Sequence, residues 1–132
     1  MNTRSDEERI LRQLIADWSA AARQRNYEGV LAHHAPNILM FDVPPPFQSE
    51  GLAAYRKTWD LFFGSMAEPP TFDFSDVRVT VGADLAFATA QGRCLSREKD
   101  GTEEIHFRLT MCFQKQNDKW LIVHEHHSLP SV

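Results

Sequence analysis

The sequence predicts an α+β domain in which three N-terminal helices pack on one face of a mostly antiparallel sheet. Residues up to about 66 carry helical periodicity interrupted by one short strand, and from residue 71 the apolar residues recur at every second position. Helices that precede a run of meandering strands are typical of this class. The 132 residues are 42% hydrophobic and 24% charged and show no repeat or linker, so we expect residues 1–132 to form a single domain.

The first two helices are predicted from their caps and from their apolar period. Ser5 and Glu8 fit the S-x-x-E capping box, which favours a helix start at this point. Apolar residues then recur every four positions, at Ile10, Leu14, Trp18 and Ala22. Asn26 is typical of the cap of a second, short helix over residues 27–34, which Pro36 ends because proline cannot continue a helix.

A short strand and a third helix follow. The stretch NILMFDV, residues 37–43, predicts a strand, and the three prolines at 44–46 end it because they cannot donate ladder hydrogen bonds. Residues 51–66 predict a helix that ends before Pro69 and Pro70. This helix carries a stripe of large side chains that suits either core packing or the wall of a pocket: Leu52, Tyr55, Trp59, Phe62, Phe63 and Met66.

Four strands complete the predicted order α-α-β-α-β-β-β-β. In residues 71–81 the phenylalanines fall in one parity and the valines in the other, so we expect a β-bulge near Ser75. The later strands are expected over residues 85–96, 103–116 and 119–129. The stretches GAD, KDG and QND provide the turns before and between them.

Charge and hydropathy exclude several classes of function. The formal net charge of -4 argues against a nucleic-acid partner, because phosphate binding needs a basic surface. No apolar run approaches the roughly 20 residues of a membrane span, and the N-terminus lacks the apolar segment of a signal peptide. We therefore expect a cytoplasmic protein without a membrane partner. Cys94 and Cys112 have no metal-binding or redox spacing and are expected in the core.

The closing stretch WLIVHEHHSLP holds three of the six histidines. Strict alternation along a strand sends His124, His126 and Ser128 to one face and Glu125 and His127 to the other. These polar residues are therefore not expected to form one cluster.

The turn before this strand decides which residues of the preceding strand share each face. A two-residue turn and a three-residue turn place opposite faces of the two strands side by side, because a one-residue shift in pairing exchanges the two faces of a strand. We favour the three-residue turn, which pairs Arg108 with His126 and Thr110 with His124 and gathers polar groups on a face that suits a pocket. The opposite, apolar face suits a homodimer interface, formed by Phe107, Leu109, Met111, Leu121 and Val123.

The element order and two motifs resemble the nuclear-transport-factor-2-like superfamily over nearly the whole chain, and within it the ketosteroid-isomerase-like and SnoaL-like proteins. The motifs are FDVPPP before the third helix and RLTMCFQKQNDKWLIVHEHHSLP at the end. The resemblance implies a curved sheet that helices wrap into a cone with a pocket inside. It implies no single chemistry, because the superfamily includes isomerases, dehydratases, polyketide cyclases and association domains.

Three residues are the candidates for catalysis. Histidine changes charge near neutral pH, and His126 is the expected polar centre of the pocket. Asp42 resembles the general-base aspartate of ketosteroid isomerases, which also precedes a proline; capping of the proline turn is its alternative role. Arg108 suits an anionic substrate group or an ion pair with Asp42. The further candidates, for ligand binding, are Trp18, Tyr55, Trp59, Phe62, Thr110, His124 and Ser128.

The pattern supports two functions. In the first, the protein binds a hydrophobic, carbonyl-bearing small molecule and moves a proton on it, as an isomerase, cyclase or dehydratase without a cofactor. In the second, the pocket holds a ligand, or the domain dimerises, without catalysis. The H-x-H motif supplies only two of the three or four ligands that a metal needs, so no metal site is predicted. Steroid isomerisation itself is not expected, because Trp18 stands where those isomerases carry a tyrosine donor.

Overall fold

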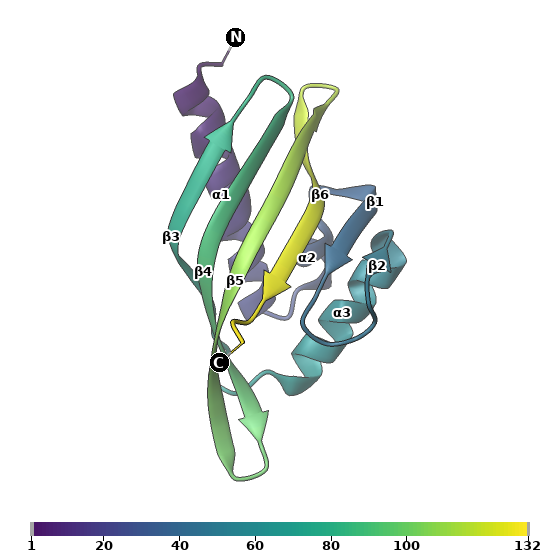
Figure 1. Ribbon diagram of the computed structural model, residues 1–132, viewed down its shortest axis with the longest axis vertical. Helices are drawn as coiled ribbons and strands as arrows, with labels where there is room; N and C mark the ends of the chain where they lie inside the picture. Colours follow the sequence, from purple (N-terminus) through teal and green to yellow (C-terminus); the bar gives the residue numbers. More distant parts are fainter. Residues whose placement is uncertain (1, 132) are drawn as a thin grey trace.

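Within residues 2–131, which the computed structural model describes, six strands form one twisted sheet and three helices lie against one of its faces (Figure 1). Along the chain the elements are α1 (Arg4–Arg23), α2 (Tyr27–Leu31), β1 (His34–Phe41), β2 (Ser49–Glu50), α3 (Leu52–Ser65), β3 (Phe72–Val81), β4 (Leu85–Glu98), β5 (Gly101–Gln116) and β6 (Lys119–Ser128). The strands lie in the order β2-β1-β6-β5-β4-β3. Neighbouring strands are antiparallel except for β1 and β6, which are parallel, so the predicted α+β class is confirmed.

The first helix begins before its predicted cap. The hydroxyl of Thr3 accepts the amide of Asp6, and the Asp6 carboxylate accepts the amide of Thr3, which completes a capping box. The predicted Ser5–Glu8 pair is therefore wrong as the cap. Thr3 and Asp6 offer the same hydroxyl and carboxylate spacing two residues earlier, and this pair lets the helix begin at Arg4.

The second helix is shorter than predicted because the backbone turns at His33. Asn26 caps this helix as predicted, since its side chain accepts the amide of Gly29. The helix ends at Leu31, and His33 takes a φ of 60° in the left-handed region, which a right-handed helix cannot include. His34 consequently begins β1, and its side chain is buried.

The aromatic stripe of α3 faces the sheet. Gly51 adopts a φ of 87°, which favours glycine, and turns the chain from β2 into the helix. Tyr55, Trp59 and Phe63 are buried along the face that α3 presents to the core. This helix therefore supplies both core packing and, as shown below, one wall of a cavity.

Two β-bulges decide which side chains face the helices. The bulge predicted near Ser75 is confirmed, since the register of β3 with β4 shifts between Ser75 and Arg78. In the β5–β6 hairpin the turn has two residues, so the favoured three-residue turn is wrong. The register of β5 with β6 then shifts between Cys112 and Phe113, which leaves Val123 as an extra residue of β6.

With the bulge at Val123, the polar residues of the hairpin share one face, as predicted, but they pair across the two strands differently from the prediction. Arg108 pairs with Ser128, and Thr110 pairs with His126, instead of Arg108 with His126 as predicted. Arg108 and His126 are both exposed on the outer face of the sheet. The prediction that this polar face lines a pocket is therefore wrong.

The opposite face of β5 packs beneath the helices. Phe107, Leu109 and Met111 are 8%, 1% and 0% exposed and belong to the core, so they cannot form the predicted dimer interface. The physical reason is that the helices bury their own apolar stripes only against the apolar face of the sheet. The polar residues of the hairpin are left on the outside.

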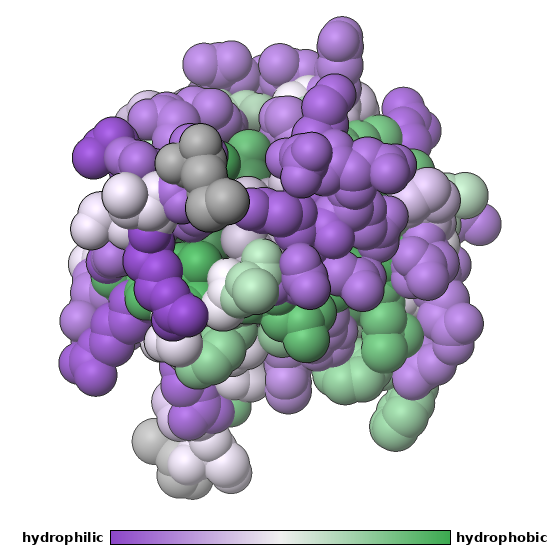
Figure 2. Space-filling model, turned by 90° about the horizontal axis from the view of Figure 1, so that it is seen from above, coloured by the Kyte–Doolittle hydropathy of each residue, from purple (hydrophilic) through white to green (hydrophobic). Residues whose placement is uncertain are grey.

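The surface is largely hydrophilic where Figure 2 shows it, with apolar side chains gathered in smaller areas between the polar ones. No helix within residues 2–131 combines the length and the apolar character that crossing a bilayer requires.

Two adjacent residues of β5 test this assignment of faces. Leu109→Ala removes a buried side chain, so we expect the free energy of unfolding to fall by about 2–5 kcal/mol. Arg108→Ala changes an exposed side chain, so we expect a fall of less than about 1 kcal/mol. Urea unfolding of both variants measures the difference, and a larger loss from Arg108→Ala would reverse the assignment.

Candidate functional site

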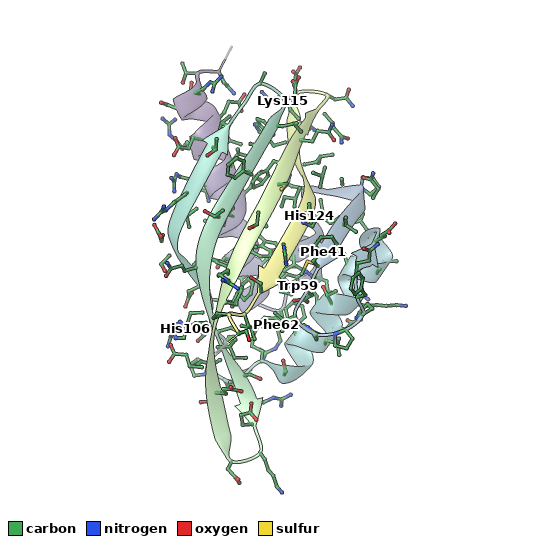
Figure 3. The ribbon with its side chains drawn as sticks, viewed as in Figure 1. Phe41, Trp59, Phe62, His106, Lys115 and His124 are labelled. Atoms are coloured by element: carbon green, nitrogen blue, oxygen red, sulfur yellow. The ribbon has the colours of Figure 1, made fainter. Side chains whose placement is uncertain are left out.

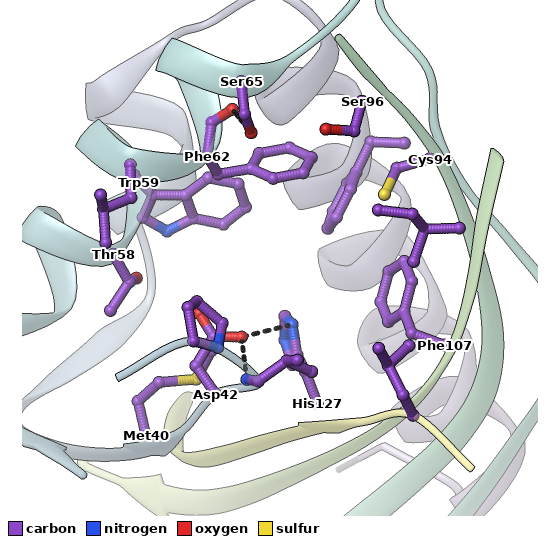
Figure 4. Close-up of a pocket in the computed structure, with 16 residues that line it drawn as sticks. Met40, Asp42, Thr58, Trp59, Phe62, Ser65, Cys94, Ser96, Phe107 and His127 are labelled. Atoms are coloured by element: carbon purple, nitrogen blue, oxygen red, sulfur yellow. Dashed lines mark hydrogen bonds and ion pairs between the residues drawn. The ribbon is translucent and has the colours of Figure 1, made fainter. Parts of the chain in front are cut away.

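A cavity of about 370 Å³ lies between α3, the loop that follows β1 and the inner faces of β3 to β6 (Figure 4). Most of its wall is apolar, and the large contributors are Trp59, Phe62, Phe72, Ile105, Phe107 and Leu129. The polar lining residues are Asp42, His127, Thr58, Ser65, Cys94 and Ser96, and none of the described lining residues is Arg or Lys. The cavity therefore suits a neutral apolar molecule that presents polar atoms at a few points.

Asp42 is the acidic residue of the cavity wall. It follows the last residue of β1, where the prolines at 44–46 turn the chain away from the sheet. Its Oδ1 accepts the amide of Val43 at 2.8 Å, which is the turn-capping role weighed from the sequence. Capping leaves further acceptor sites on the carboxylate, so Asp42 can cap the turn and face the cavity at once.

His127 reaches the cavity from the inner face of β6. Its ring stacks on Phe107 with the centroids 5.6 Å apart, and its side chain is only 11% exposed. Nε2 lies 3.3 Å from Oε1 of Glu125. On the other side of the ring, Nδ1 lies 3.9 Å from Oδ1 of Asp42, as the dashed line in Figure 4 marks. Because Nε2–H donates to Glu125, the neutral ring has its lone pair on Nδ1, on the side of Asp42.

Behind His127 lies a fully buried carboxyl group. Glu125 is 0% exposed, and its Oε2 lies 2.5 Å from Nε2 of His34 and 2.5 Å from the hydroxyl of Tyr55. The Tyr55 hydroxyl accepts the indole N–H of Trp18 at 3.1 Å. These bonds join α1, α3, β1 and β6 into one network, so the wall that carries His127 is fixed from four elements.

The network also sets the protonation of two of its members. Burial raises the pKa of Glu125, but hydrogen bonds from His127 and His34 and the positive charge of the His34 ring outweigh burial and lower this pKa to about 2. Burial raises the pKa of Tyr55 well above its ordinary value, and the negative charge of Glu125 raises it further. At neutral pH Glu125 is therefore an acceptor and Tyr55 a donor.

The structure brings only part of the predicted site together. Asp42, Trp59 and Phe62 line the cavity, and Trp18 and Tyr55 lie behind its wall in the buried network. The remaining five predicted residues lie on the outer face of the sheet and do not line the cavity: Arg108, Thr110, His124, His126 and Ser128.

The outer residues have partners of their own. Nδ1–H of His124 donates to the carbonyl of Leu39 at 2.7 Å, and its ring packs edge-on against Phe41 (Figure 3). Nε–H of Arg108 donates to the hydroxyl of Ser128 at 3.1 Å. Among the residues that the structure describes, no three His, Cys, Asp or Glu side chains are placed to hold a metal ion. The H-x-H motif is thus part of the outer surface and not of the cavity.

Sequence reasoning missed His34, Glu125 and His127. His34 is expected in a helix from its position before Pro36, and strict alternation along the last strand hides the bulge that turns His127 inward. One usable signal was present, because Glu125 is a lone carboxylate on an otherwise apolar face. Such a group is costly to bury unless donors surround it, so it indicates partners such as the two histidines found here.

Residues 11–131 match the family model described as a SnoaL-like domain. No curated protein matches the sequence. Among solved structures, an NTF2-like protein of unknown function from Pseudomonas putida KT2440 is 30% identical, with a TM-score of 0.87 over 99% of this chain and 92% of that chain.

Two more distant structures share the fold. A candidate dehydratase of the NTF2-like family from Streptomyces avermitilis is 17% identical, with a TM-score of 0.83 over 98% of this chain and 100% of that chain. A candidate calcium/calmodulin-dependent protein kinase II association domain from Xanthomonas campestris is 21% identical, with a TM-score of 0.79 over 100% of this chain and 95% of that chain. At this identity the likeness concerns the fold alone.

Glu125 is expected to make the stability of the fold depend on pH. Its pKa in the folded protein, about 2, lies below the ordinary 4.5, so the unfolded chain binds more protons between these values. The stabilisation is complete above about pH 4.5 and is lost as the pH falls toward 2, with a magnitude of the order of 3 kcal/mol. Urea unfolding at a series of pH values measures this loss.

The matched control for this prediction is a second glutamate. Glu125→Gln should remove the part of this pH dependence that Glu125 contributes and leave the part due to Asp6, Glu7 and Glu104, whose carboxyl pKa values are also lowered. Glu28→Gln, which changes an exposed side chain of α2, should keep the full pH dependence. A pH dependence of undiminished size in Glu125→Gln would show that the buried carboxyl is not the group responsible.

Proposed function

Because this chain belongs to the SnoaL-like domain family, we propose that its cavity binds a neutral, hydrophobic, carbonyl-bearing molecule and that His127 and Asp42 move a proton on it. The reaction is of the isomerase, cyclase or dehydratase type. The observation that carries the proposal is the pair of proton acceptors at one end of a largely apolar cavity, with Nδ1 of His127 3.9 Å from Oδ1 of Asp42. In this proposal His127 takes the place that the sequence suggests for His126.

The geometry of the pair suits general acid–base catalysis. A separation of 3.9 Å is too long for a hydrogen bond, so the lone pairs of Nδ1 and of the carboxylate remain available to a ligand. The Nε2–H bond to Glu125 holds the His127 ring in one orientation and in one tautomer. The apolar walls exclude water, which strengthens the interaction of each acceptor with a bound molecule.

The proton transfer can be written without a cofactor. His127 or Asp42 takes a proton from the carbon next to a carbonyl, the C–H electron pair forms a C=C bond, and the carbonyl oxygen takes the negative charge. Return of the proton to a different carbon completes an isomerisation. Transfer of the proton to a leaving hydroxyl group breaks the C–O bond, restores the carbonyl and releases water, which completes a dehydration.

Two features of the cavity support a neutral, oxygen-bearing ligand. No lysine or arginine is among its described lining residues, so an anionic group would find no cationic partner. The indole N–H of Trp59 is buried and makes no hydrogen bond within residues 2–131. In Figure 4 the nitrogen of this indole lies on the side of the ring nearer Asp42. A ligand oxygen that reaches this buried N–H would satisfy a donor that is otherwise costly to bury.

The second candidate function is ligand binding without catalysis in a homodimer. The outer face of the sheet favours a dimer, because Leu85 and Phe87 are 62% and 47% exposed in the strand beside β5. With the core residues of β5 excluded, this proposal places the interface on Leu85 and Phe87 together with Leu121 and Val123 of β6. Sedimentation at micromolar concentration tests it, and a species with the mass of one chain would rule it out.

The compound 5-nitrobenzisoxazole tests the proposed base directly. This neutral, flat molecule loses a ring proton to a base, its N–O bond breaks, and a coloured phenolate that bears a nitrile is released. We expect His127→Gln and Asp42→Asn each to lower the rate of the protein by about 10²-fold or more, which is the usual contribution of a positioned base. His126→Ala is the matched control on the outer face and should leave the rate unchanged.

The outcomes separate the two functions. A rate that falls with His126→Ala but not with His127→Gln would overturn the assignment of the site. A wild-type protein that binds the compound but reacts no faster than His127→Gln would overturn catalysis and leave the binding function.

The free indole N–H of Trp59 predicts a preference for carbonyl ligands. Fluorenone and fluorene share one ring skeleton and differ in a single oxygen. We expect the wild type to bind fluorenone about 10-fold more tightly, as one additional hydrogen bond to a buried donor allows. Trp59→Phe keeps an aromatic wall without the donor and should bind the two compounds equally. Calorimetric titration measures both, and a preference that persists in Trp59→Phe would assign the oxygen to another group.

A further inference from the structure

A buried ion pair lies directly behind the proposed base, and the reaction described above does not use it. We infer that His34 and Glu125 share one additional proton and act as an electrically neutral unit that orients His127 without attracting a proton onto it. His34 is thus a positioning residue that keeps His127 available as a base at neutral pH. This inference rests on the proposed function of His127 and deepens it.

The hydrogen bonds of the two ring nitrogens of His34 show that an additional proton is present. Nδ1 of His34 lies 2.8 Å from the carbonyl oxygen of Ala32, which can only accept, so Nδ1 carries a hydrogen and donates. Nε2 lies 2.5 Å from Oε2 of Glu125. Two lone pairs would repel each other at this distance, so a second proton lies between the two groups. His34 is therefore an imidazolium paired with a carboxylate, and the pair has no net charge.

Burial makes this neutrality necessary. The side chains of His34 and Glu125 are both 0% exposed, so water cannot screen an unpaired charge on either group. A buried charge without a partner is strongly destabilising. Tyr55 adds an uncharged donor to the same carboxylate oxygen, and Trp18 adds an uncharged donor to Tyr55. The network is therefore satisfied by one cation, one anion and neutral donors.

The groups around His127 show that the His34–Glu125 pair controls the charge close to this ring. The titratable groups that face His127 and Glu125 are His34 from β1, Asp42 from the loop that follows β1, and Tyr55 from α3. The elements α1 and β5 present only uncharged side chains there, which are Trp18, Phe107 and Met111. Apart from Asp42 at the cavity, the charge felt by His127 is thus set by the His34–Glu125 pair.

The consequence concerns the protonation of His127. A carboxylate without His34 would favour the imidazolium form of a ring that donates to it, and an imidazolium cannot accept a proton from a substrate. The neutral pair gives the same hydrogen bond and the same tautomer without that attraction. His34 therefore allows Glu125 to orient the His127 ring without favouring the charged form of that ring.

The test follows the ring signal of His127 by NMR against pH, with no ligand present and with His127→Gln used to assign the signal. In His34→Gln the amide can still donate to Glu125 but holds no additional proton, so the carboxylate becomes unpaired. We expect the pH at which His127 takes up a proton to rise by about 1–3 units in this variant. In Glu125→Gln the amide oxygen accepts from His127 and the amide nitrogen donates to His34, so the unit stays neutral and this pH should change little.

The opposite pattern would overturn the inference. If Glu125→Gln lowers the pH of proton uptake by more than about one unit while His34→Gln leaves it unchanged, Glu125 is an unpaired carboxylate in the wild type. Should His34→Gln fail to fold, the Glu125→Gln result decides alone, because the two models predict different shifts for it. No ligand is involved, so this result is independent of the rate test of the proposed function.

A rate measurement separates positioning from structural damage. In His34→Gln the pH profile for 5-nitrobenzisoxazole should move upward by the same amount as the NMR titration, while the maximal rate is retained. A lower maximal rate at an unchanged profile would mean that His34 only supports the fold.

Discussion

The buried carboxyl of Glu125 is the group on which the arrangement of this site depends. It has no contact with solvent, yet it receives hydrogen bonds from His34 on β1, Tyr55 on α3 and His127 on its own strand. A carboxylate can be buried only if donors surround it, so each of these elements has to lie where its donor reaches this point. The same bonds place the His127 ring at the cavity. Stability and the proposed chemistry therefore rest on one set of contacts.

A single extra residue in β6 makes this arrangement possible. Before the bulge at Val123, Trp120 and Ile122 face the core; after it, Glu125 and His127 do. Without the bulge, strict alternation would send both of the latter to the outer face, because a one-residue shift exchanges the two faces of a strand. The bulge thus allows a strand to bury large apolar residues at one end and to carry polar groups to a cavity at the other.

The fold could be predicted from the sequence, and the site only in part. Helix caps, the proline stops and the change from helical to alternating period indicate the order of elements, and each depends on residues close together in the chain. Asp42, Trp59 and Phe62 could be placed because each lies in or next to such an element. His34 and Glu125 are 91 residues apart, so their contact depends on the parallel pairing of β1 with β6, which no local pattern reveals.

The bulge at Val123 was equally hidden. The valine there fits an ordinary strand, and the choice between a two-residue and a three-residue turn has no strong signal in QND. Both candidate registers assume unbroken alternation, and the observed hairpin combines the shorter turn with a shift further along. Grouping by parity therefore found which residues share a face but not which face is buried. That choice depends on the helices, which need an apolar surface to cover.

The tautomer of His127 tests the central claim most directly. Heteronuclear NMR at neutral pH distinguishes a protonated ring nitrogen from an unprotonated one through their different nitrogen shifts. We expect Nε2 of His127 to carry the hydrogen, because it donates to Glu125, and Nδ1 to carry the lone pair that faces Asp42 and the cavity. A ring with its hydrogen on Nδ1 would contradict this account, because the nitrogen at the cavity could then no longer act as a base.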